Sequence, residues 1–169
     1  MRKLTLLALL ASSFTFASGN MKEHDHKMHK EMTVKLKENK SFNTALEKYE
    51  AVAQAFFDNE VENIKKTSKD LITAINAIDN EEIKKTLKFS KKKLEEISKS
   101  DNLEKNQEAF STVSQAFHVV LTKYAENGKY ARYYCPMVKK YWLQNTKKSG
   151  DKTYNIYAAK SMPHCGGMK

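Results

Sequence analysis

The middle of this 169-residue chain lacks the side chains that usually carry metal or thiol chemistry. Residues 33–134 contain no methionine, no cysteine and a single histidine, His118. Methionine is an ordinary core-filling residue, so its absence from so long a stretch is informative. No grouping of histidine, carboxylate and nucleophile there rises above chance, so we predict that the protein is not an enzyme. A lone helical histidine is more typical of structure than of ligation, and we assign His118 a structural role.

Arginine is almost absent as well. Arg2 and Arg132 are the only arginines, and lysines supply the rest of a formal net charge of +10. Proteins that bind nucleic acid usually depend on arginine for bidentate contacts to phosphate and guanine. We therefore predict no nucleic-acid partner and interpret the lysines as a solvated exterior.

Long apolar runs are missing too. The run from Leu4 to Phe16 is shorter than the roughly 20 residues that span a bilayer. It follows Arg2 and Lys3 and leads to the small residues at 17–19, a pattern typical of a cleaved secretory signal peptide. We expect residues 1–19 to be removed, which takes away two positive charges and leaves a net +8. The mature protein is then predicted to be soluble and periplasmic, with no membrane span.

Proline and glycine are absent from residues 41–126, and apolar residues recur there at helical spacing. Four such stripes with short connections predict an all-α fold, an antiparallel four-helix bundle within a domain at 41–169. The predicted core positions are Leu46, Tyr49, Ala53, Phe56, Ile64, Leu71, Ile75, Ile78, Ile83, Leu87, Leu94, Ile97, Phe110, Val113, Phe117, Val120 and Tyr124.

Aspartates mark the expected starts of the later helices. Asp58 can cap the second helix, while Asp79 with Glu82 and Asp101 with Glu104 have the spacing of a capping box.

The character of the chain changes at residues 129–169, which hold both prolines and both cysteines. We expect a loop or short-strand segment that folds back on the bundle. Proline disfavours helix at the preceding residue, so the stretches around Pro136 and Pro163 should be extended or turned. In an extended chain residues i and i+2 face the same side, which would align Cys135 with Met137 and Met162 with His164. These two pairs of side chains that bind soft metals could then converge on one ion. The candidate ligands are Cys135, Met137, Met162, His164, Cys165 and Met168.

A disulfide between Cys135 and Cys165 is the alternative, because paired cysteines in an exported domain are commonly bridged. It would close a loop of about 31 residues. The resulting loss of chain entropy in the unfolded state would stabilise the fold by about 3.5 to 4 kcal/mol. Both alternatives need the cysteines to be adjacent, so both stay open here.

A second cluster of soft ligands lies in residues 20–40, which are polar, lack periodicity and are predicted to be a mobile leader. Thiolate, thioether and imidazole are the groups that select soft metals, so we predict Cu(I) as the metal, with silver, zinc and nickel as the other candidates. The leader could instead be merely a solubilising tail. Its candidate ligands are His24, His26, Met28 and His29, flanked by Met21 and Met32.

Several C-terminal pieces resemble a family of periplasmic domains of unsettled function. The pieces are Tyr-Tyr-Cys-Pro-Met from residue 133, Tyr-Trp-Leu-Gln-Asn from 141, Tyr-Asn-Ile-Tyr from 154 and Ser-Met-Pro-His-Cys-Gly from 161. That family occurs alone or fused to copper/silver-efflux membrane-fusion adaptors of the Cus type. The resemblance covers about residues 41–169 and implies a helical domain closed by a Cys/Met-containing tail with suspected heavy-metal binding. The matching positions are Cys135, Met137, Trp142, Met162 and Cys165.

These observations predict a periplasmic heavy-metal-binding protein that captures Cu(I) or Ag(I). It would buffer the metal or hand it to an efflux system, with an efflux adaptor as the candidate partner. The alternative function is a disulfide-stapled helical interaction domain with no metal role.

Overall fold

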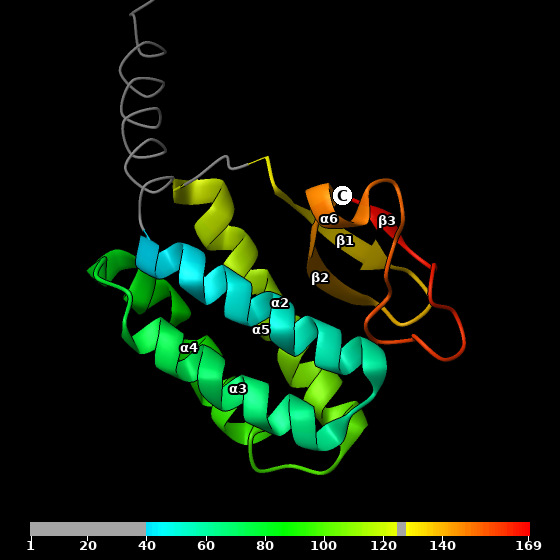
Figure 1. The fold of residues 1–169 in the computed structure, drawn as a ribbon, viewed down its shortest axis with the longest axis horizontal. Coiled ribbons are helices and arrows are strands. Elements are labelled where there is room, and N and C mark those ends of the chain that lie inside the picture. Colours follow the sequence, from blue (N-terminus) through cyan, green and yellow to red (C-terminus); the bar gives the residue numbers. More distant parts are fainter. Residues whose placement is uncertain (1–39, 125–127) are drawn as a thin grey trace, which may run out of the picture.

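The computed structural model describes residues 40–124 and 128–169, so the predicted signal peptide and the leader through residue 39 lie outside the description. Four long helices come first: α2 (Lys40–Asp58), α3 (Val61–Asn76), α4 (Glu81–Ile97) and α5 (Leu103–Tyr124). Each packs against the next one along the chain (Figure 1). The described part is thus mostly helical, as predicted, and it contains no helix with the length and apolarity needed to cross a membrane.

The predicted apolar stripes form the core. Every predicted core side chain from Leu46 to Val120 is buried, which confirms the helical periodicity. The centre is a set of packed rings, in which Phe110 lies 5.1 Å from Tyr49 and 4.9 Å from Phe56 between ring centroids. Aromatic side chains each bury about 150 to 250 Å², so these rings carry much of the packing energy.

The helix starts differ from the prediction by one or two residues. The capping positions are Glu60, Asn80 and Asn102, where we expected Asp58, Asp79 and Asp101. The Asn80 side chain accepts a hydrogen bond from the Ile83 N–H at 3.0 Å, while Asp79 accepts one from Ser41 Oγ. Asparagine and aspartate cap helices about equally well, so an adjacent Asp-Asn pair does not reveal which residue caps.

A small antiparallel sheet follows the helices. Its strands are β1 (Tyr130–Cys135), β2 (Lys140–Asn145) and β3 (Gly167–Met168), in the order β2-β1-β3, with the short helix α6 (Thr146–Ser149) after β2. The sheet and its loops lie to one side of the helices, with β2 against α5 (Figure 1). The expectation of a short-strand segment folded back on the helices is confirmed, and the domain is not purely helical.

Buried tyrosine hydroxyls join the sheet to the helices. Tyr49 Oη accepts the Leu143 backbone N–H at 3.0 Å across 94 residues of sequence and lies 2.7 Å from Ser114 Oγ. Tyr157, in the C-terminal loop, donates through Oη to the Tyr141 carbonyl of β2 at 2.9 Å and lies 3.5 Å from Ser114 Oγ of α5. Burial raises the pKa of both phenols, so they stay neutral and keep their hydrogen-bonding protons. The position of β2 on the helices is therefore set by directional bonds as well as by packing.

Candidate metal centre

The two cysteines meet where β1 ends. Cys135 is the last residue of β1, Cys165 precedes β3, and their sulfur atoms lie 2.8 Å apart as free thiols. Cys135 is buried and Cys165 is half-buried. The predicted adjacency of these cysteines is confirmed, although they are 30 residues apart in sequence.

The turn after Cys135 is built to stabilise a thiolate. Burial alone would raise the pKa of the Cys135 thiol, but the Cys165 thiol and the backbone N–H groups of Val138 and Met137 donate to its sulfur and hold the pKa below its usual range. The same contact, followed by burial, raises the pKa of Cys165. Within the pair, Cys135 is therefore the cysteine that loses its proton more easily.

Cys165 is held by a buried asparagine. Asn155 Nδ2 donates to the Cys165 carbonyl at 3.0 Å, and the Asn155 backbone N–H donates to the Pro163 carbonyl at 2.8 Å. Gly166 follows with φ +122°, and a Cβ there would lie 2.8 Å from the Trp142 ring. Sequence reasoning did not identify Asn155. Its one signal was its place in the Tyr-Asn-Ile-Tyr piece of the family resemblance.

The stretches around Pro136 and Pro163 are turned, which is one of the two forms predicted for them, so the side-chain alignment expected of an extended chain does not form. Residues 136–139 form a turn instead of an extended stretch, so Cys135 points into the core while Met137 is 67% exposed. Residues 162–165 also turn, through a hydrogen bond from the Cys165 N–H to the Met162 carbonyl. Proline excluded helix at both places, but it could not distinguish a turn from a strand.

The remaining C-terminal candidates are buried to different extents. Met162 is half-buried, whereas Met168 lies in β3 and is 61% exposed. His164 is exposed, and its Nδ1 donates to the Thr153 carbonyl at 2.8 Å, which leaves Nε2 available. Metal-binding histidines commonly have their second ring nitrogen held in this way.

The sulfur separation is compatible with either chemistry. Disulfide formation requires the sulfurs to approach to about 2.05 Å. Two thiolates on one ion, each at about 2.3 Å and at a tetrahedral angle, would be about 3.8 Å apart. From the present 2.8 Å, either chemistry requires the sulfur–sulfur distance to change by about 1 Å. Cys165 is better placed than Cys135 to make this movement, because it is only half-buried.

The described residues supply few hard or nitrogen ligands near the thiols. Within 40–124 and 128–169, no group of three or more His, Cys, Asp or Glu side chains is arranged to hold a metal ion. The leader candidates His24, His26, Met28 and His29 lie outside this part of the chain. His118 is half-buried, and burial followed by the charge of Arg132 lowers its pKa.

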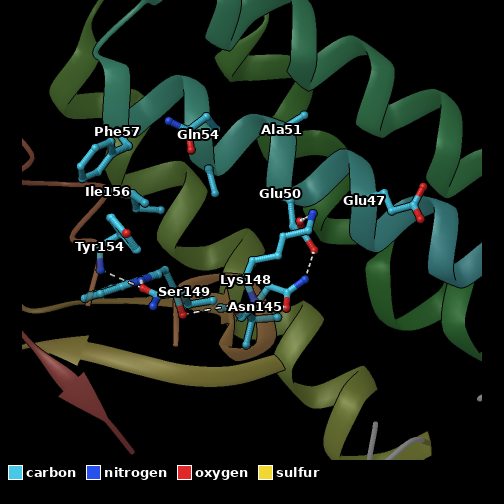
Figure 2. A pocket seen from close by; sticks show the side chains of 14 residues that line it. Glu47, Glu50, Ala51, Gln54, Phe57, Asn145, Lys148, Ser149, Tyr154 and Ile156 are labelled. Carbon is cyan, nitrogen blue, oxygen red and sulfur yellow. Dashed lines mark hydrogen bonds and ion pairs between the residues drawn. The ribbon is translucent and has the colours of Figure 1, made fainter. Parts of the chain in front are cut away.

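A second polar cluster surrounds Glu50 on α2. Its carboxylate accepts a hydrogen bond from Asn145 Nδ2 and forms an ion pair with Lys148 (Figure 2). It also accepts a hydrogen bond from the Tyr130 hydroxyl. Burial alone would raise the pKa of Glu50, but these three partners hold it below its usual range. The cluster ties α2 to β1 and α6, so its role is mainly structural.

Comparisons with known proteins add no identity to these observations. No protein-family model, curated protein or solved structure matches this chain.

Proposed function

We propose that this protein captures Cu(I) or Ag(I) in the periplasm at the Cys135–Cys165 pair. The scaffold would be an antiparallel four-helix bundle, and the metal would be buffered or handed to an efflux system. The observation that carries the proposal is the contact of the two cysteine sulfurs at 2.8 Å, with the backbone N–H groups of Val138 and Met137 directed at the Cys135 sulfur. Thiolates are the ligands that soft monovalent metals prefer.

The geometry of the turn after Cys135 favours a metal-ligand role for this cysteine over a structural disulfide. A sulfur that accepts several N–H groups keeps much of its anionic charge neutralised while it binds a cation. In a disulfide the sulfur carries no such charge, and these donors would gain little. The exposed thioethers of Met137 and Met168 provide soft ligands at the surface, where a metal would arrive or leave.

Anaerobic Cu(I) competition titration with a parallel thiol count tests the proposal. The mature protein should contain two reactive thiols and bind one tightly held Cu(I). Cys135→Ser should abolish tight binding, whereas deletion of residues 20–32 should lower only stoichiometry or capture rate. Met137→Leu removes a thioether at nearly constant volume and should weaken binding only modestly, which makes it the matched control.

The opposite result would favour the disulfide-stapled interaction domain. In that case the native protein would show no free thiols and no Cu(I) binding, and Cys135→Ser would lower only its stability. If the leader deletion removed all binding while Cys135→Ser changed nothing, the metal site would belong to residues 20–32.

A further inference from the structure

One side of α4 carries exposed lysines around an exposed phenylalanine. Between residues 84 and 93 this helix has six lysines and no acidic residue. Lys85, Lys88, Phe89 and Lys92 are all exposed, and their helical spacing places them on one side of α4. We call these four residues the lysine face.

The positive charge of the lysine face is not neutralised within the fold. Its lysines form no ion pair with any residue in the parts of the chain that the structure describes. Two flanking lysines do have acidic partners, and these partners lie outside the lysine run, in the pairs Lys84–Glu81 and Lys93–Glu96. The middle of α4 is therefore available to an anionic partner.

The arrangement of these lysines costs the fold some stability. Lys88 lies three residues after Lys85 and four residues before Lys92, and like charges at these spacings repel each other on a helix surface. A glutamate at position 88 would form two attractive pairs instead. Folding alone thus does not account for a lysine at the centre of this face, whereas a binding role does.

Phe89 adds an apolar group to the face. It is 55% exposed, and Lys93 Nζ lies 5.5 Å from the centroid of its ring. The other large apolar side chains of α4 are buried, namely Ile83, Leu87, Leu94 and Ile97. Lysines combined with an exposed aromatic ring are typical of helices that lie in the interface of a bilayer, where the ring reaches the acyl boundary and the lysines meet the headgroups.

The composition of the face favours a lipid surface over other anionic partners. Protein interfaces are depleted in lysine and enriched in arginine. Nucleic-acid contacts also favour arginine, which α4 lacks. Anionic headgroups, in contrast, attract any positive charge that lies near the bilayer surface, and lysine provides it.

We infer that the lysine face binds the surface of a bilayer that contains anionic phospholipids. Lys85, Lys88 and Lys92 lie against the headgroup phosphates in this complex, and Phe89 enters the boundary with the acyl chains. A few lysines and one ring provide reversible attachment, not a permanent anchor. The inference does not depend on the proposed metal function.

The place of α4 in the fold leaves the thiols uncovered in such a complex. α4 packs against α3 and α5, and the sheet that carries Cys135 lies at the opposite side of the molecule (Figure 1). A protein attached through the lysine face therefore presents the Cys135–Cys165 pair away from the bilayer.

Sedimentation of the mature chain with lipid vesicles tests the inference. The parent should bind vesicles of equal parts phosphatidylglycerol and phosphatidylcholine, should not bind pure phosphatidylcholine, and should be released by salt, which screens exposed charges. Lys88→Glu replaces a positive charge by a negative one and should weaken binding by about 25-fold, at about fivefold per unit charge. It should also raise the unfolding temperature slightly, so that weaker binding cannot be attributed to a loss of the fold.

Lys147→Glu is the matched control. It makes the same change of net charge at an exposed lysine of α6, beside the sheet. It should alter vesicle binding by less than about twofold, because salt screens a charge that lies far from the bilayer. Equal weakening by the two variants would mean that binding depends on net charge alone and would overturn the inference, as would a parent that does not bind anionic vesicles.

Phe89 has a separate readout. In the Phe89→Trp variant, tryptophan emission should shift to the blue on addition of anionic vesicles and should be quenched by bromine atoms on the acyl chains. The parent provides the baseline, because its single tryptophan, Trp142, is buried and its emission should not respond. An emission of the variant that does not respond to bound vesicles would overturn the inference, and equal binding to polyglutamate would then assign the face to an acidic protein partner.

Discussion

Gly166 determines how Cys165 approaches Cys135. Its φ of +122° is a conformation that side-chain-bearing residues rarely adopt, and its Cα faces both the Trp142 ring and the Tyr134 carbonyl. The neighbouring Gly167 has open space where a Cβ would be. Two adjacent glycines thus have different roles, and only the first one positions a thiol.

Gly166→Ala should lower the free energy of unfolding by about 2 kcal/mol, because it combines backbone strain with a clash against Trp142. It should also weaken Cu(I) or Ag(I) binding by moving Cys165. Gly167→Ala should change stability by less than about 0.5 kcal/mol. Urea unfolding of both variants measures the difference, and equal effects would mean that the turn is not constrained in this way.

Glu50 predicts a pH dependence of stability. Its pKa is lower in the folded chain than in the unfolded one, so its contribution is present above the unfolded pKa and is lost as the pH falls through the folded pKa. Stability should therefore decline in acid below about pH 4.5. Glu50→Gln should lower stability at neutral pH and flatten that decline, while Glu47→Gln, which removes an exposed carboxylate, should do neither. Urea midpoints between pH 3 and 7 provide the measurement.

At the scale of single residues, the sequence indicated which two cysteines lie together better than how the surrounding side chains are oriented. The adjacency of Cys135 and Cys165 was predictable because both chemistries considered for them require it. The role of Asn155 was not, since a buried asparagine in a loop has no periodicity that would mark it. The prediction of the helix caps was wrong for a related reason, because Asp79 and Asn80 cap helices about equally well.

Among the elements, the β1–β2 hairpin has a backbone irregularity next to Cys135. Lys139, the last residue of its turn, has φ +52°, in the left-handed region that favours glycine. The turn directs the Val138 and Met137 N–H groups at the Cys135 sulfur. A lysine there retains strain that the hairpin must offset.

Lys139→Gly should stabilise the protein by about 0.5 kcal/mol, because relief of left-handed strain outweighs the greater entropy of glycine in the unfolded chain. Lys139→Ala removes the same charge and stem but keeps the Cβ, so it should give no gain. Thermal unfolding of the two variants distinguishes the backbone effect from a side-chain effect. A gain with alanine would trace the strain to the lysine side chain instead.

The helices were predictable because their apolar residues repeat with a clear period and no glycine or proline interrupts them. The strands were predictable only as a class. β1 and β2 are mostly aromatic or half-buried, so they show no clean alternation, and β3 is just two residues long. Pairing between Tyr133 and Met168 depends on the loop that carries Cys165, and no local pattern encodes it.

At the scale of the whole molecule, most of the core lies between the helices, and Cys135 is the one described candidate ligand among its fully buried members. Far-ultraviolet circular dichroism of the mature protein in a strong chelator should therefore retain its full helical signal, unlike a zinc finger, whose folding depends on its ion. Addition of Ag(I) should raise the unfolding temperature without increasing helicity. Collapse of the signal in chelator would show that the metal is structural.

The hydrogen bond from Leu143 to Tyr49 has a consequence for how the protein is made. Since 94 residues separate the two partners, a chain that enters the proposed periplasmic location from its N-terminus would pass through an interval in which the helices are present and β2 is not. During that interval the nascent helices must keep an aromatic surface and a buried hydroxyl waiting for strands that do not yet exist. Both thiols follow the helices in the sequence, so they meet only after the residues that form the helical scaffold have been added.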